Sequence, residues 1–247
     1  MLIFIGAMAV IFLASLIKST FGFGEGMVNM SLLTLLLGLD QAVPLVAILA
    51  LGGSAYILLQ DFKQVDWKEL WPFLIGALLA APIGLSMGEY LPAFWMRKLL
   101  GLLIMAFAVY KLYQTYQIAE DLGKPKGPEG RKWGYLFGLL GGLFGGAYNV
   151  AGPAGVLYGN FRAWPPAIFR VTMQGYFMLL GIAVVSGHAY MGRYSPEVLK
   201  MAAFALIPIA LGVFLGRLFN QKLSNPALFN KLVYFLLILL GLILIIK

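Results

Sequence analysis

The chain has 247 residues, of which 61% are hydrophobic and 11% are charged, and it contains no cysteine. Because a soluble domain carries about 25% charged residues, this composition excludes a water-soluble globular protein and predicts an all-α integral membrane protein. The formal net charge of +8 does not indicate a nucleic-acid partner, because the basic residues stand singly at the ends of apolar runs, as loop charges and anionic-lipid contacts do. With no cysteine and a single histidine, we expect no metal site and no cofactor.

Ten apolar segments are expected in chain order, with a solvated linker in the middle. Four are short and rich in glycine and form two pairs: 2–18 with 26–39, and 133–147 with 150–160. Six are long enough to cross a bilayer core of about 30 Å: 42–60, 70–90, 94–117, 165–188, 197–220 and 227–246. The polar stretch 118–132, which contains proline and glycine, divides the chain into a first repeat, 1–117, and a second repeat, 133–247.

The two halves resemble each other in sequence. The stretch 80–88 is similar to 206–216, because each has a proline followed by a Gly-x-x-x-Gly pair that lets helices approach closely. The stretch 91–99 is similar to 225–232, in the same order along the chain. Short segments interrupted by glycine or proline at corresponding positions of two halves point to the substrate site of a transporter. We therefore predict two inverted-topology repeats, each a short, broken helix pair followed by three full transmembrane helices.

The distribution of basic residues predicts the orientation in the membrane. The loop 61–69, the linker 118–132 and the turn 217–231 carry more Lys and Arg than the connections on the opposite side, which places them in the cytoplasm. Three spans per half then turn the second half upside down relative to the first and leave both termini outside. We expect a multi-pass protein of the inner (cell) membrane with lipid as a partner.

The first interruption, 18–29, is the main candidate for a substrate site. The helix expected over 26–39 begins directly after its glycines, so its free N–H groups and positive dipole end would face the gap and favour an anion. We expect Gly24 and Gly26 to contact the substrate, and Asn29 either to cap the helix or to donate to a ligand. The alternative is that the glycines only permit tight packing.

Glu25 is the only acid that the sequence places inside an apolar region. Ionisable groups inside a membrane are costly and indicate a function. Burial disfavours the charged form of a carboxylate, so one hypothesis is that Glu25 binds and releases a proton and thereby couples transport to protons. The other is that Glu25 is an ion-pair partner of Lys18. Both stay open.

The second interruption, 138–155, is also rich in glycine. Pro153 suits the first turn of a helix, and no Walker lysine follows the glycines, so a nucleotide site is not indicated. We expect a second half-helix N-terminus that faces the first, with Asn149 and Gly152 at the substrate.

A group of polar residues near the start of the next span is the third candidate. The guanidinium of Arg170 suits an oxyanion bidentately, and Thr172 and Gln174 follow it on the same segment. We expect these three residues in the substrate site. The alternative for Arg170 and for Arg162 is contact with lipid headgroups.

These motifs together resemble the TauE/SafE sulfite-exporter family. The resemblance rests on 21–26, on 141–146 with Gly152-Pro153, and on Arg170-Val171-Thr172. It implies a membrane carrier for small sulfur-containing anions, such as sulfite or organosulfonates. The chain departs from the pattern at Asn149-Val150-Ala151, and it has Pro44 where a counterpart of Arg170 would stand, which implies that the second half supplies the positive charge.

The function that we predict is a secondary transporter, in the direction of export, that works by alternating access and takes a small anion. The alternatives are a passive anion channel of the same architecture and a membrane-embedded enzyme. We expect no enzymatic activity, because the chain has one histidine, no cysteine and no acid pair inside an apolar segment.

Overall fold

The computed structural model describes residues 2–117, 130–222 and 226–246, and in these ranges the chain forms ten α-helices and one 3₁₀ turn, Phe62–Gln64. The helices are α1 (Leu2–Phe21), α2 (Glu25–Leu37), α3 (Leu39–Asp61), α4 (Trp67–Tyr90), α5 (Ala93–Gln117), α6 (Trp133–Tyr148), α7 (Gly152–Phe161), α8 (Pro166–Tyr190), α9 (Pro196–Lys222) and α10 (Pro226–Ile246). Within the described chain, six of them are long and apolar enough to cross a membrane: α1, α3, α4, α5, α8 and α9. The predicted all-α membrane fold is confirmed, while most of the expected linker lies outside the described residues.

Helix α1 is longer than the sequence predicts. The sequence predicts an apolar run over 2–18, which falls short of the roughly 20 residues that cross a bilayer. The helix continues through the polar residues that follow, to Phe21, and provides 19 residues of apolar span. It tolerates these polar residues because they are buried with partners: Ser19 Oγ donates to the carbonyl of Val213 at 2.8 Å, and Lys18 forms an ion pair. The first pair therefore joins one full-length helix to one short helix.

Helices α2, α6 and α7 are short, as predicted. They have 13, 16 and 10 residues, which correspond to about 20, 24 and 15 Å. None of these lengths reaches the roughly 30 Å of a bilayer core. Each of the two chain interruptions, between α1 and α2 and between α6 and α7, therefore adjoins at least one helix that is too short to span the bilayer.

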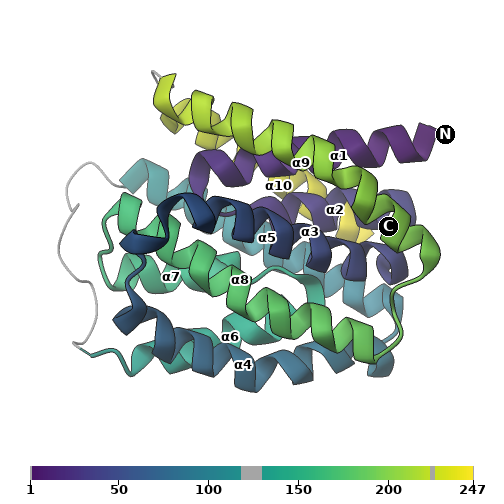
Figure 1. The fold of residues 1–247 in the computed structure, drawn as a ribbon, viewed down its shortest axis with the longest axis horizontal. Coiled ribbons are helices and arrows are strands. Elements are labelled where there is room, and N and C mark those ends of the chain that lie inside the picture. Colours follow the sequence, from purple (N-terminus) through teal and green to yellow (C-terminus); the bar gives the residue numbers. More distant parts are fainter. Residues whose placement is uncertain (1, 118–129, 223–225, 247) are drawn as a thin grey trace.

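The helix contacts are repeated between the two halves. Helix α1 packs along α9, and α6 packs along α4; α3 lies on α8, and α5 lies on α10 (Figure 1). When the helices are matched in order, from α1 with α6 to α5 with α10, the α1–α9 contact maps onto the α6–α4 contact, and the α3–α8 and α5–α10 contacts each map onto themselves. This pattern agrees with the two repeats that the sequence predicts. Their opposite orientation in the membrane stays a prediction.

Glycines form the closest helix contacts. Gly138, Gly142 and Gly146 recur every four residues along α6, and each faces a backbone carbonyl of α4. A Cβ atom on Gly142 would clash with the carbonyl of Ala77. On the other side of the bundle, Gly212 of α9 approaches the backbone of α1 in the same way. Such small-residue seams allow backbones to touch in lipid, where apolar burial provides little driving force between helices.

The connections lie at two opposite ends of the bundle. Both chain ends, marked N and C in Figure 1, lie at the same end as the α8–α9 connection, and the α3–α4 connection lies at the other. This arrangement agrees with the expectation that both termini lie on one side of the membrane. Which side that is stays a prediction.

The α4–α6 seam makes a first testable prediction. Gly142→Ala is expected to destabilise the protein by about 1–3 kcal/mol, because the added methyl group has no room against the Ala77 carbonyl. The matched control is Gly52→Ala, because a Cβ on Gly52 meets nothing within 4 Å. Thermal unfolding of the detergent-purified variants checks this. Equal melting temperatures for the two variants would contradict the packing described.

Candidate functional site

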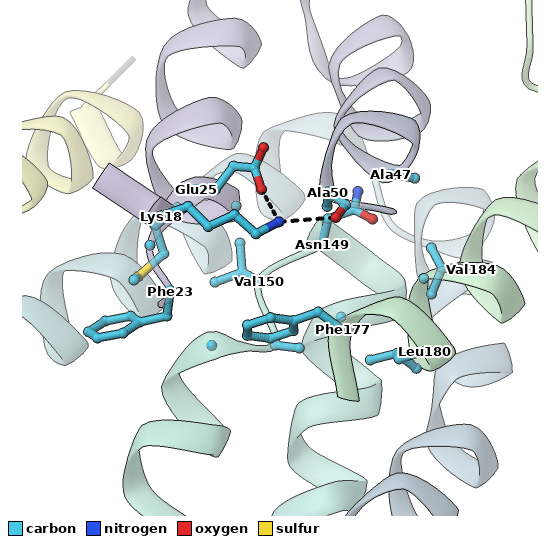
Figure 2. Close-up of a pocket in the computed structure, with 17 residues that line it drawn as sticks. Lys18, Phe23, Glu25, Ala47, Ala50, Asn149, Val150, Phe177, Leu180 and Val184 are labelled. Atoms are coloured by element: carbon cyan, nitrogen blue, oxygen red, sulfur yellow. Dashed lines mark hydrogen bonds and ion pairs between the residues drawn. The ribbon is translucent and has the colours of Figure 1, made fainter. Parts of the chain in front are cut away.

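A cavity of about 50 Å³ lies where the two chain interruptions meet. It is lined from the end of α1, the start of α2, the α6–α7 break, α3 and α8 (Figure 2). Five of the predicted site residues line it: Gly24, Glu25, Gly26, Asn149 and Gly152. One water molecule needs about 10–15 Å³, so the cavity has room for a few waters or for one small anion.

Lys18 supplies the positive charge in this cavity. It stands in the last turn of α1 and is only 2% exposed. Its Nζ forms an ion pair with the carboxylate of Glu25 and donates to the carbonyl of Ala50 at 3.0 Å (Figure 2). Of the two hypotheses for Glu25, the ion pair with Lys18 is therefore present. It does not decide whether the same carboxylate exchanges a proton.

Glu25 has unused hydrogen-bonding capacity. It is the first residue of α2, where the positive end of the helix dipole stabilises a carboxylate. Its Oε2 faces Lys18, whereas its buried Oε1 has no hydrogen-bond partner among the described residues. A buried carboxylate oxygen without a partner is costly. A group in the cavity that donates a hydrogen bond to Oε1, or that accepts one from its protonated form, would remove that cost.

Gly53 of α3 makes room for the ion pair. A Cβ atom at this position would lie 3.1 Å from Lys18 Nζ and 3.5 Å from each carboxylate oxygen of Glu25. Alanine here would push on both charged groups. The pair is thus enclosed by three helices, α1, α2 and α3.

Glycine is required at two points of the first interruption. Gly24 caps α2 with φ of 99°, a left-handed conformation that costs other residues free energy. Gly26 lies against the carbonyl of Asn149, so that a Cβ atom would clash with it. The two interruptions are therefore in backbone contact, which only glycine at position 26 permits.

Asn149 forms the turn of the second interruption. Its φ is 56°, a left-handed conformation that Asn tolerates better than most residues. Its Nδ2 donates to the carbonyl of Val43 on α3 at 2.8 Å. Gly152 follows at the start of α7, so both short helices begin at the cavity. The first N–H groups of a helix have no partner within the helix, and they make this cavity suitable for an anion.

The described residues also enclose a second, larger cavity. Its volume is about 330 Å³, and it is lined by Val43, Met96, Ala147 and Arg193 among others. Asn149 lines the small cavity and bonds to Val43, which lines the large one. This hydrogen bond therefore joins a residue of the small cavity to a residue of the large one.

Four predicted site residues do not line the small cavity. The side chain of Arg170 lies against Gly22, where a Cβ atom would be 3.2 Å from Arg170 Cα. Gln174 Nε2 donates to the carbonyl of Gly22 at 2.7 Å, and Thr172 Oγ1 accepts from the N–H of Asp66 at 3.0 Å. Arg170 and Gln174 thus contact the first interruption from α8, whereas Thr172 contacts the N-cap residue of α4.

Asn29 is the fourth of these residues. It is fully buried, and neither of its amide atoms has a partner among the described residues. It does not cap α2, whose N-cap is Gly24 without a side-chain hydrogen bond. The expectation of a cap is wrong because Asn29 lies past the first turn of the helix.

A second buried acid was missed in the sequence. Glu69, 6% exposed, lies in the first turn of α4. Arg162 donates to its carboxylate from Nη2 at 2.8 Å and from Nε at 3.1 Å, and Tyr158 and Arg131 donate as well. Hydrogen bonds to Glu69 raise the pKa of Arg162. The lipid contact expected for Arg162 is therefore replaced by an ion cluster that ties the end of α7 to α4.

Comparisons with known proteins agree on one family. The family model described as "Sulfite exporter TauE/SafE" matches residues 7–244. A protein of Cupriavidus necator named "Probable sulfite/organosulfonate exporter TauE" is 25% identical over 243 residues, which cover 96% of this chain and 91% of that protein. No solved structure matches the chain.

The buried ion pair makes a second prediction. Lys18→Met is expected to destabilise the protein by about 3–5 kcal/mol, because it leaves the carboxylate of Glu25 buried without its cation. Adding Glu25→Gln removes that charge, so the double variant should be more stable than Lys18→Met alone.

Thermal unfolding of the single and double variants measures this coupling, with the exposed Lys63→Met as the control. Strictly additive losses would show that the two side chains do not interact.

Proposed function

Because the chain belongs to the TauE/SafE sulfite exporter family, we propose that it is a secondary transporter that exports small sulfur-containing anions, such as sulfite or organosulfonates, by alternating access. One observation carries the proposal: the buried ammonium of Lys18 lies in a cavity at which two short helices begin. Positive charge and helix N-termini both favour an anion there.

In this proposal the anion takes the place of the Glu25 carboxylate at Lys18. Two anionic groups beside one buried cation would leave an uncompensated charge, which is costly away from water. Glu25 therefore takes up a proton when the anion binds, and releases it when the anion leaves. The proton and the anion move together, so a high internal anion concentration drives export, and anion affinity rises as the pH falls.

The other predicted residues divide into two roles. Gly24, Gly26, Asn149 and Gly152 line the cavity with backbone and amide groups and contact the anion. Arg170 and Gln174 act from α8 by holding the first interruption in place, and Thr172 acts by holding the start of α4. A cluster on α8 is thus proposed to position the site, while Lys18 supplies the charge.

In this proposal, the contact between Asn149 and Val43 is a partition between the two cavities, and alternating access opens it. In the described conformation Asn149 bonds to Val43 between them. Breaking this bond and separating the two interruptions would connect the small cavity with the large one. A second contact between the two halves is the ion cluster at Glu69, which joins α4 to the end of α7. Rocking of one half against the other moves both contacts.

Transport in proteoliposomes gives the third prediction. Under an imposed proton gradient, the protein should accumulate radiolabelled sulfite above its equilibrium level, and Lys18→Gln should abolish the accumulation. Lys63→Gln is the matched control, because Lys63 is exposed.

Flux that follows only the sulfite gradient would contradict a carrier and indicate a channel. Unchanged transport by Lys18→Gln would remove Lys18 from the site.

The partition formed by Asn149 and Val43 gives the fourth prediction. Because the chain contains no cysteine, an introduced cysteine is the only thiol that a maleimide can label. A cysteine introduced at Val184, which lines the small cavity, should react several-fold faster with a membrane-impermeant maleimide when Asn149→Gly is added. Glycine keeps the left-handed turn and deletes the side chain that bonds to Val43.

The control is a cysteine at Met96 in the large cavity, whose labelling rate should not change. An unchanged rate at position 184 would contradict the role of Asn149 as a partition.

A further inference from the structure

The small cavity has two chemically different walls. One wall carries Lys18, Glu25 and Asn149, and the other is formed by α8 with Phe177, Leu180 and further apolar side chains. Figure 2 shows Phe177 on the side of the cavity opposite Lys18. A ligand that bridges these walls needs a charged end and an apolar end.

The residues on the apolar wall follow one face of α8. Phe177, Leu180 and Val184 are spaced three and four residues apart, which places them on the same side of a helix. Gly181, also in the lining, adds no side chain between them. This face presents no hydrogen-bond donor from its side chains, so the oxygens of an oxyanion would lose hydration against it without compensation.

The charge of the cavity favours a monoanion. Lys18 is one buried cation, and Glu25 becomes neutral when it is protonated. A ligand with a single negative charge then leaves the site neutral. A dianion leaves one negative charge without a partner in a buried site, which is strongly unfavourable.

We propose that Phe177 determines specificity, and that the site prefers monoanionic sulfonates with a short alkyl group to the sulfite dianion. The sulfonate group binds at Lys18, and the alkyl group lies against Phe177 and Leu180. This inference rests on the proposed function, because it assigns the two ends of a substrate to the two walls of the same cavity.

The volume of the cavity limits the alkyl group. Because the cavity is small, at about 50 Å³, we expect it to favour a short alkyl group of one or two carbon atoms. Each methylene group that is buried should strengthen binding about fourfold, until the cavity is full. Affinity should therefore rise from methanesulfonate to ethanesulfonate and fall for propanesulfonate and butanesulfonate.

Competition against radiolabelled sulfite binding to the purified protein tests this order at one fixed pH. Phe177→Ala should shift the preferred sulfonate by one or two carbon atoms towards longer chains, because it enlarges the apolar end only. Phe214→Ala is the matched control, since Phe214 of α9 is 58% exposed, and it should leave the preferred length unchanged.

The outcomes separate this inference from the proposed function. If sulfite binds but the alkanesulfonates show no preferred length, or Phe177→Ala does not shift it, the role of Phe177 is wrong and the anion site stands. If neither sulfite nor any alkanesulfonate binds to the wild-type protein, the proposed function fails as well.

Discussion

The ion pair between Lys18 and Glu25 is the constraint on which the site depends. Neither charge is tolerable alone at membrane depth, so the end of α1 and the start of α2 must face each other. Gly24 lets the chain reverse between them, and Gly53 leaves space for both charged groups. The geometry of the first interruption thus follows from the need to keep one buried cation beside one buried carboxylate.

The helix bundle supplies the second half of the site. The seams between α4 and α6 and between α1 and α9 bring backbones into contact through small residues. Because the same arrangement occurs in both halves, the α6–α7 break is brought against the α1–α2 break, where Gly26 touches Asn149. Further support comes from α8, since Gln174 holds the carbonyl of Gly22. The cavity is the space that remains between these two fixed interruptions.

The sequence predicted the elements well because each depends on local features. Apolar run length placed the helices to within a few residues, and clustered glycines located both interruptions. The polar end of α1 was misjudged, because the partner of Ser19 lies on α9, nearly two hundred residues away in the chain. Lys18 was considered only as a partner for Glu25, since its place in a cavity depends on the packing of α3 and α8.

The cluster at Glu69 joins residues from three distant segments, so it was not predicted from any one stretch of the sequence. An acid directly before a predicted span, with arginines next to two other predicted segments, is the only pattern in the sequence that points to this cluster.

The central claim is that an anion replaces Glu25 at Lys18 and that Glu25 then carries a proton. Proton uptake during anion binding tests it most directly, in weakly buffered solution with the purified protein. Methanesulfonate is the suitable ligand, because it stays a monoanion across the pH range of the experiment. The account predicts uptake of about one proton for each methanesulfonate bound, and no uptake by Glu25→Gln. Binding of methanesulfonate to the wild-type protein without proton uptake would contradict it.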